Sequence, residues 1–332
     1  MKILLSASRK HYDFDNDKLI IKHSVGILCQ LFSNVLREMG EVEFISDTDV
    51  VKGKEYDLIV SWPRNFFNLT HMNKFKKSVC FLNIAEPSYL KRVLLAEAGR
   101  LGCKLSDCFQ PINFYNADLN FLIGNDFVIK QYTDAGIPRE KISRIAYRHN
   151  TIPFKARDKN KRPIFLHLAT TLGLRKGFWH AVEDFKKADL DAELWCVGKI
   201  QKETFWLNYM AKQTDPRMKM LGWIDCDTPR YTEILNKADF MVFPSFGEGQ
   251  PGTIIEALEG GCIPLLTEES GFQYYPLGRY IRGDIDIWQK AFDLGNNGFR
   301  ALQLRGQLLL EDQYNNDTFK ERVRTEINNL WQ

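Results

Sequence analysis

Cysteine is sparse in this chain of 332 residues and is never spaced for a metal site or a disulfide framework. The seven cysteines are odd in number and form no Cys-x-x-Cys pair. The closest two, Cys103 and Cys108, have no second Cys or His pair that would complete a zinc site. We therefore expect free thiols in a reducing cytoplasm.

Long apolar runs and strong net charge are also missing. No apolar run approaches the roughly 20 residues of a membrane span. The start, MKILLSAS, is followed at once by Arg9, Lys10 and His11, which predicts a buried strand rather than a signal peptide. The net charge of +3 shows no basic excess of the kind that nucleic-acid binders carry. A soluble cytoplasmic protein is predicted, at most peripheral at the inner face of a membrane.

Two motifs that would identify other enzymes are absent. No Gly-x-Gly-x-x-Gly follows the first expected strand, Lys2–Ser6, which disfavours a dehydrogenase. No His-Glu-x-x-His or Asp-x-Asp-like pair stands near the Gly-rich loop after Phe243. We therefore predict neither a metal nor a cofactor.

Short apolar runs alternate with longer amphipathic stretches, which indicates βαβ units and mainly parallel sheets. The strands expected in the first half are Lys2–Ser6, Val42–Ser46, Asp57–Trp62, Ser78–Ile84, Asp118–Gly124 and Ile142–Tyr147. Those expected in the second half are Ile164–Ala169, Leu194–Val197, Met218–Leu221, Phe240–Phe243 and Ile263–Leu266. Helical spacing is seen over Ser24–Met39 and from about Ile287 to the end.

The alternation breaks at Ala156–Pro163, a charged stretch closed by proline, as expected of a linker. We predict one Rossmann-like domain over residues 1–155, a second over 156–315, and a C-terminal helix, 316–332, that crosses back to the first. Two such domains in tandem would form a cleft between the carboxyl ends of two parallel sheets, where open α/β folds bind ligands.

The most informative stretch runs from Phe243 to Ala257 and reads FPSFGEGQPGTIIEA. A strand ends at Phe243, a Gly-rich turn follows, and a helix begins near Pro251 or Gly252. The amides of the first helical turn are then available to bind a phosphate, which the helix dipole favours.

Two carboxylates, Glu248 and Glu256, lie in this stretch although a carboxylate repels a phosphate. Binding sugar or ribose hydroxyls explains their presence, because a carboxylate accepts hydrogen bonds from two neighbouring hydroxyls. The alternatives are a helix cap for Glu248 and a solvated surface charge for Glu256. The apolar neighbours of Glu256 weaken the second alternative.

The segment EGQPGTIIEALEGGCIP, from Glu248 to Pro264, resembles the Glu-x7-Glu signature of the family-4 retaining glycosyltransferases, the glycosyl transferases group 1. The resemblance implies the GT-B architecture, with an N-terminal acceptor domain and a C-terminal donor domain around an inter-domain cleft. It implies a nucleotide-sugar donor, for which we predict a UDP- or GDP-sugar. Glu256 would bind the ribose, and Glu248 would contact the sugar or the leaving group. The residues assigned to donor binding are Gly173, Gly249, Gln250, Pro251, Gly252, Thr253, Glu256, Trp223 and Ile224.

Arg175 and Lys176 follow the strand Ile164–Ala169 and precede Gly177. This stretch resembles the family's loop whose Arg and Lys neutralise the diphosphate. Two fixed cations opposite a helix dipole would stabilise the charge on the leaving phosphate. The family usually separates the two cations, so which of them contacts which phosphate stays open. With Glu248 they are the predicted catalytic residues.

Other assignments rest on a thinner resemblance. Trp223 and Ile224 stand where the family receives the nucleobase, and core packing explains Trp223 nearly as well. On the acceptor side we name Gly26, Glu86 and His149. Glu86 occupies the place of a His found in many members, and a helix-start carboxylate is the alternative.

The predicted function is a metal-independent, retaining transfer of a sugar to an acceptor hydroxyl. The alternatives are a sugar-nucleotide epimerase, a glycoside phosphorylase, or a non-catalytic nucleotide-sugar binding protein. The acceptor is left open among a glycan, a lipid carrier, a small metabolite, a protein and modified DNA. A basic helix with Lys91, Arg92 and Arg100 suggests peripheral membrane contact, with a solvated polar face as the alternative. No oligomeric state is predicted.

Overall fold

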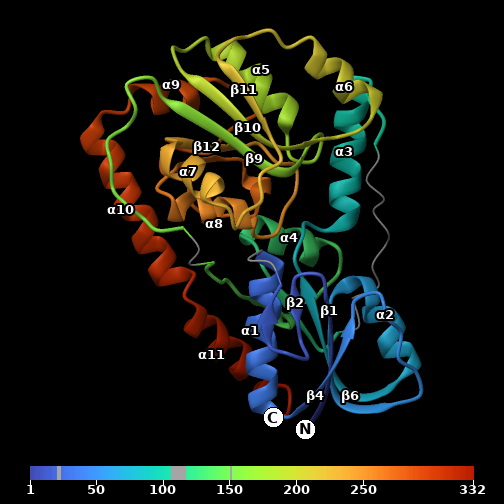
Figure 1. The fold of residues 1–332 in the computed structure, drawn as a ribbon. Helices are drawn as coiled ribbons and strands as arrows, with labels where there is room; N and C mark the ends of the chain where they lie inside the picture. The colour runs from blue at the N-terminus through green and yellow to red at the C-terminus, as the bar shows by residue number, and fades with distance from the viewer. Residues whose placement is uncertain (21–23, 106–116, 150–151) are drawn as a thin grey trace. The chain divides into compact units, whose positions relative to one another are not determined.

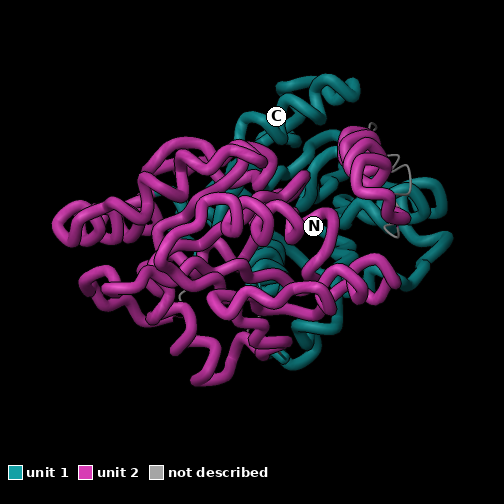
Figure 2. The backbone as a smooth tube through the Cα atoms, turned by 90° about the horizontal axis from the view of Figure 1, so that it is seen from above, with its two compact units in different colours: residues 1–87, 110–149, 313–332 teal, residues 88–109, 150–312 magenta. Residues whose placement is uncertain are grey.

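The computed structural model describes residues 1–20, 24–105, 117–149 and 152–332 (Figure 1). The chain divides into two compact α/β units (Figure 2). Unit 1 comprises residues 1–87, 110–149 and 313–332, and unit 2 comprises 88–109 and 150–312. Which of the two units binds the donor and which binds the acceptor stays a prediction.

A parallel sheet is the centre of unit 1, and over the described residues it has the order β4-β1-β5-β6-β7-β8. Its strands are β1 Lys2–Ala7, β4 Glu41–Ser46, β5 Glu55–Ser61, β6 Lys74–Leu82, β7 Leu119–Leu122 and β8 Ile142–Arg144. Its helices are α1 Ser24–Met39, α2 Pro63–Met72, α4 Asp126–Asp134, the 3-10 turn η1 Arg139–Lys141 and α11 Asn316–Asn329. The chain moves from β1 to β4 on one side and then to β5 on the other, so the direction of strand order switches between β1 and β5.

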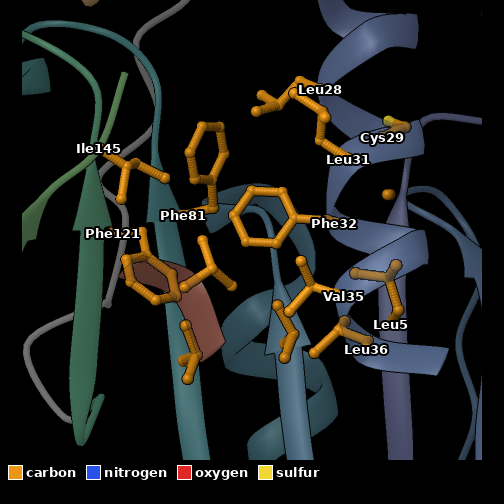
Figure 3. Close-up of a cluster of buried hydrophobic side chains, with 14 of the residues drawn as sticks. Leu5, Leu28, Cys29, Leu31, Phe32, Val35, Leu36, Phe81, Phe121 and Ile145 are labelled. Atoms are coloured by element: carbon orange, nitrogen blue, oxygen red, sulfur yellow. The ribbon is translucent and has the colours of Figure 1, made fainter. Parts of the chain in front are cut away.

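Aromatic packing joins α1, the sheet and α11 in the core of unit 1. The ring of Phe32 lies 5.3 Å from that of Phe81 and 5.9 Å from that of Phe121, between centroids (Figure 3). On α11, Phe319 lies 5.3 Å from Phe32, although 287 positions separate them in the chain. All four side chains are buried, and each buried ring contributes about 1.5–3 kcal/mol. The last helix is therefore an integral part of unit 1.

Unit 2 has its own parallel sheet, ordered β11-β10-β9-β12-β13 over the described residues. Its strands are β9 Ile164–Leu172, β10 Glu193–Ile200, β11 Met218–Gly222, β12 Phe240–Phe243 and β13 Ile263–Leu266. Its helices are α3 Pro87–Leu101 (from Ser88 on), α5 Phe178–Ala188, α6 Thr204–Ala211, α7 Pro229–Lys237, α8 Gly252–Glu259, η2 Glu268–Ser270, α9 Asp286–Asp293 and α10 Asn296–Gln313. Strand order switches between β9 and β12.

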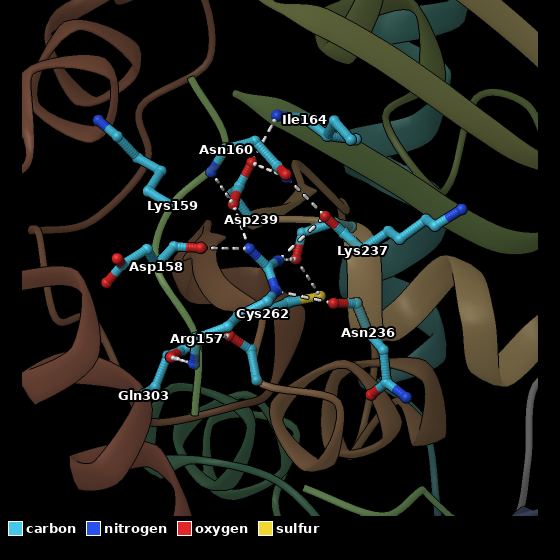
Figure 4. Close-up of polar contacts among 12 residues, drawn as sticks. Arg157, Asp158, Lys159, Asn160, Ile164, Asn236, Lys237, Asp239, Cys262 and Gln303 are labelled. Atoms are coloured by element: carbon cyan, nitrogen blue, oxygen red, sulfur yellow. Dashed lines mark hydrogen bonds and ion pairs between the residues drawn. The ribbon is translucent and has the colours of Figure 1, made fainter. Parts of the chain in front are cut away.

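The charged stretch 156–163 is bound to unit 2 through Arg157 and Asp239 (Figure 4). Arg157 donates to the Asp239 carboxylate at 2.7 Å and to the carbonyls of Asn236 and Ala238 at 2.7 and 2.6 Å. Asp239 is fully buried and also accepts from the Ile164 amide at 2.8 Å. A buried charge such as that of Asp239 must be paired. The polar residues of this stretch therefore make contacts inside unit 2 as well as with solvent.

The strands expected from periodicity are all present, and α1 has the predicted bounds Ser24–Met39. A small antiparallel hairpin, β2 Tyr12–Asp13 with β3 Lys18–Leu19, was not predicted. Two-residue strands are too short to show a period, so sequence patterning cannot reveal them. In the part of the chain that the structure describes, no helix is both long and apolar enough to cross a membrane.

Candidate active site

The loops that carry the predicted donor residues leave neighbouring strands at the switch point of unit 2. β9 and β12 are adjacent and parallel, so their carboxyl ends lie at the same edge of the sheet. The loop after β9 carries Arg175 and Lys176, and the loop after β12 carries Ser245–Pro251. Open α/β sheets bind ligands at this kind of position.

Close backbone approach joins these two loops. Gly177 has φ +69°, and a Cβ there would stand 2.0 Å from the carbonyl oxygen of Pro244. Only glycine therefore fits this position. The amide of Phe246 donates to the carbonyl of Arg175 at 2.9 Å, and the Ser245 hydroxyl donates to the same carbonyl at 3.0 Å. The cation loop and the Gly-rich loop thus form one hydrogen-bonded structure.

The three predicted catalytic residues meet in an ion cluster. One carboxylate oxygen of Glu248, Oε1, lies 2.6 Å from Nη1 of Arg175 and 2.8 Å from Nζ of Lys176. The Ser245 hydroxyl lies 3.2 Å from the same oxygen. Burial alone would raise the pKa of Glu248, but the two cations hold it below its ordinary value. Glu248 is therefore a buried carboxylate held ionised between two cations, and the helix-cap alternative is wrong.

Glu256, the predicted ribose ligand, is 5% exposed, so it is not a solvated surface charge. The hydroxyl of Tyr231 on α7 donates to its Oε2 at 2.5 Å. Burial, the Glu256 charge and this bond raise the pKa of Tyr231, so the phenol stays protonated and donates. Tyr231 thereby fixes one oxygen of Glu256.

Most of the remaining predicted donor residues lie at or just before the start of α8, and Gly173 lies in the loop after β9. The helix begins at Gly252, with Pro251 at its N-cap and no side chain capping it. Gly249 lies against Gly271, which has φ +74° and where a Cβ would stand 1.7 Å from the Gly249 carbonyl oxygen. On the other loop, a Cβ at Gly173 would stand 1.8 Å from Oε1 of Gln201. Gln250 precedes α8 and Thr253 is its second residue, so both lie near the N-terminus of the helix, where the dipole favours anions.

Trp223 and Ile224 follow β11 and differ in environment. The Trp223 ring is 43% exposed, with Nζ of Lys199 4.6 Å from its centroid, so core packing does not account for it. Its indole N–H donates to Asp225 at 2.8 Å. Ile224 is buried. Trp223 is therefore the exposed residue of the two, and its side chain is aromatic.

The predicted acceptor-side residues all lie in unit 1. Gly26 is buried in the first turn of α1, and Glu86 follows β6 and is buried. The amide of Glu86 donates to Oε1 of Gln131 at 3.1 Å. His149 is buried beside Tyr147, with 5.5 Å between ring centroids. Their role in acceptor binding stays a prediction.

His167 is a core residue. It is fully buried, and its Nδ1 lies 2.9 Å from the carbonyl of Val242. Burial lowers its pKa to about 4, so the ring is neutral near pH 7. Among the described residues, no group of three or more His, Cys, Asp or Glu side chains is arranged to hold a metal ion.

Two residues of this site escape sequence analysis. Ser245 lies within the informative stretch, but only its contacts with Glu248 and the Arg175 carbonyl show its part. Tyr231 is 25 residues from Glu256, and the sequence carries no signal that pairs the two. Both become visible only when the loops and helices at the switch point come together.

Comparison with known proteins agrees with this geometry. Residues 164–275 match the family model described as Glycosyl transferases group 1. No curated protein sequence matches the chain. The structure resembles sucrose-phosphate synthase from Thermosynechococcus elongatus, with TM-score 0.67, 14% identity and coverage of 100% of this chain and 99% of that chain.

Two further solved structures have the same fold over nearly their whole length. HepE of Anabaena, solved in complex with UDP-glucose, has TM-score 0.61 and 14% identity and covers 99% of this chain and 100% of that chain. WaaG, a glycosyltransferase involved in lipopolysaccharide biosynthesis, has TM-score 0.60 and 14% identity, with 98% of each chain covered. The predicted architecture is confirmed: the chain has the two Rossmann-like halves of the GT-B fold, and residues 164–275 of its second unit match a Glycosyl transferases group 1 domain.

Proposed function

We propose that this chain transfers a sugar, with retention of configuration and without a metal ion, from a UDP-sugar to an acceptor hydroxyl. The observation that carries the proposal is the convergence of Arg175, Lys176 and Glu248 at the switch point of unit 2. The choice of uridine rests on the likeness to HepE, whose structure was solved with UDP and with UDP-glucose. A GDP-sugar is the other donor that we predict from the sequence.

The cluster has the chemistry needed to hold a diphosphate. Glu248 keeps the two cations at one point, and a diphosphate carries more negative charge than one carboxylate, so it competes for them. The amides at the start of α8 add the positive end of a helix dipole. Preorganised charge of this kind stabilises a leaving group at little reorganisation cost. Arg175 and Lys176 therefore serve as leaving-group residues in the proposal.

Glu256 supplies the ribose contact in this proposal. Its carboxylate can accept hydrogen bonds from two neighbouring hydroxyls, and Tyr231 orients it by donating to Oε2. The buried position of Glu256 strengthens such charge-assisted bonds. Trp223, with its exposed ring, is the proposed base contact.

Transfer on one face of the sugar needs no covalent enzyme intermediate. The bond between the anomeric carbon and the phosphate oxygen breaks as the acceptor oxygen forms its bond on the same face. The acceptor hydroxyl gives its proton to the departing phosphate oxygen. Glu86 and His149 are proposed to orient the acceptor, whose identity is open among glycans, lipid carriers and other hydroxyl compounds.

Calorimetric binding of UDP-, GDP-, ADP- and CMP-linked sugars to wild type, Lys176→Ala and Glu256→Ala tests the donor site. The proposal expects selective binding of one nucleotide series, slow hydrolysis of that donor, and loss of both in the two variants. Activity that survives EDTA would support metal independence. If no nucleotide sugar binds, or if both variants bind like wild type, the proposal is wrong. Conversion of the donor into an epimeric sugar, rather than its hydrolysis to the unchanged sugar, would identify an epimerase instead.

A further inference from the structure

Arg282, which follows β13 by sixteen positions, makes three contacts around the donor loop. Its guanidinium carbon lies 4.0 Å from the ring centroid of Phe246. Its Nη1 donates to the carbonyl of Ser245 at 2.9 Å, and its Nη2 lies 2.5 Å from Oε1 of Glu269. The arginine and Glu269 are both largely buried, with side chains 20% and 19% exposed. One planar cation thus holds two consecutive residues of the loop.

Glu269 also contacts the same loop directly. Its backbone carbonyl accepts from the amide of Glu248 at 3.0 Å, while its carboxylate pairs with Arg282. The Thr267 hydroxyl also donates to the Ser245 carbonyl, at 2.8 Å. The segment 267–269 and Arg282 therefore fix the loop at two points, Ser245 and Glu248.

The position of Glu248 matters because its carboxylate gathers the two cations. A loop that is free to move would let Glu248 leave Arg175 and Lys176, and the cations would then separate. Displacements of about 1 Å are enough to weaken a preorganised charged site. The contacts of Arg282 are with the Ser245 carbonyl, Phe246 and Glu269, so it would act on the ion cluster through the loop.

We propose that Arg282 is a positioning residue for donor binding, which sets the backbone of Ser245–Glu248 through Phe246, the Ser245 carbonyl and Glu269. This inference rests on the proposed function. An arginine fits the role because its planar fork stacks on a ring and donates in two directions at once. A lysine can keep the charge and one hydrogen bond but cannot stack and donate in the same way.

The test compares Arg282→Gln, Arg282→Lys and Arg279→Gln. Arg279 lies three positions away and pairs with Glu268 at 3.1 Å, but its side chain is 59% exposed, so it is a matched control. Calorimetry with UDP, or with the nucleoside diphosphate that wild type selects, measures donor-site affinity. Steady-state kinetics measure KM for donor and for acceptor separately, and thermal melting reports folding.

Arg282→Gln is expected to weaken nucleoside diphosphate binding and raise donor KM by about tenfold or more, with acceptor KM changed less than about twofold. Arg282→Lys should recover part of that loss, and Arg279→Gln should bind like wild type. If Arg282→Gln does not fold, a donor affinity of Arg282→Lys that is measurably weaker than that of wild type supports the same conclusion. Donor affinity equal to wild type in folded Arg282→Gln or in Arg282→Lys overturns the inference. If wild type binds no nucleoside diphosphate, the proposed function itself is wrong.

Discussion

The switch points of the two sheets differ in the polar groups that they bury. In unit 2, the edge after β9 and β12 holds Glu248 against Arg175 and Lys176. In unit 1, two neutral side chains are buried near the ends of β1 and β5, and Asn65 donates to the Ser6 hydroxyl at 3.2 Å. A charged edge suits an anion such as a diphosphate, whereas a neutral edge suits hydroxyl groups. This difference supports our proposal that unit 2 binds the donor and unit 1 binds the acceptor.

Among the substitutions that test this comparison, Lys176→Ala should produce the largest loss of activity. The change removes one of two cations that would face the departing phosphate, and it leaves buried Glu248 with a single cation. Transition-state stabilisation by such a group is worth about 4 kcal/mol, so kcat/KM should fall about a thousandfold. Steady-state transfer with the selected donor measures it. A fall in kcat/KM of less than tenfold would contradict a role of the unit 2 ion cluster in transfer.

Glu248→Gln should lower stability in a pH-dependent way. The pKa of Glu248 is depressed in the folded protein, so the ion cluster stabilises above the ordinary value of 4.5, and its contribution is lost as pH falls through the folded pKa. Near pH 7 the variant should lose about 3 kcal/mol, because two cations are left without their carboxylate. Urea unfolding from pH 7 to pH 3 should show the difference in unfolding free energy between the two proteins shrinking below about pH 4.5. A difference that is constant with pH would contradict the ionised cluster.

Tyr231→Phe should have a moderate effect that is confined to the donor. Removing the hydroxyl deprives buried Glu256 of its 2.5 Å hydrogen bond and costs about 1–3 kcal/mol. Nucleoside diphosphate affinity should fall about tenfold, as measured by calorimetry. Tyr209→Phe is the matched control, since its hydroxyl donates to Glu183 on α5 instead. Equal losses in the two variants would mean that the Tyr231 effect is only structural.

Glu86→Gln should give the smallest effect on donor binding. Glu86 lies in unit 1, where its amide donates to Oε1 of Gln131, and not in the unit that carries the ion cluster. Donor affinity should therefore change less than about twofold, while transfer to the acceptor falls. Calorimetry and transfer assays on one preparation separate the two readouts. A large loss of donor affinity would break the division of roles between the units.

The fold was largely predictable because its strands are short, apolar and separated by amphipathic helices. Phe240–Phe243 and Ile263–Leu266 were predicted with their observed bounds, since such fully buried strands stand out from their neighbours. The hairpin Tyr12–Leu19 was missed because two-residue strands have no period. The fixing of 156–163 by Asp239 was missed because a charge 82 positions from Arg157 gives no local signal.

The site was predictable only where it is contiguous in the chain. The stretch from Glu248 to Glu256 keeps its residues within one loop and one helix, so its resemblance to a known signature could indicate them. Tyr231 contacts Glu256 on α8 and Arg282 contacts the loop before it, both from other elements, and neither belongs to a motif. In unit 1 no contiguous motif exists for Gly26, Glu86 and His149, so their roles stay predictions.

The central claim is that the ion cluster of unit 2 binds the donor's diphosphate. Calorimetry with UDP on wild type, Lys176→Ala and Glu86→Gln tests it most directly. The account predicts that wild type and Glu86→Gln bind with closely similar affinity and that Lys176→Ala binds at least tenfold more weakly. Equal binding by all three proteins, or a loss confined to Glu86→Gln, would contradict it.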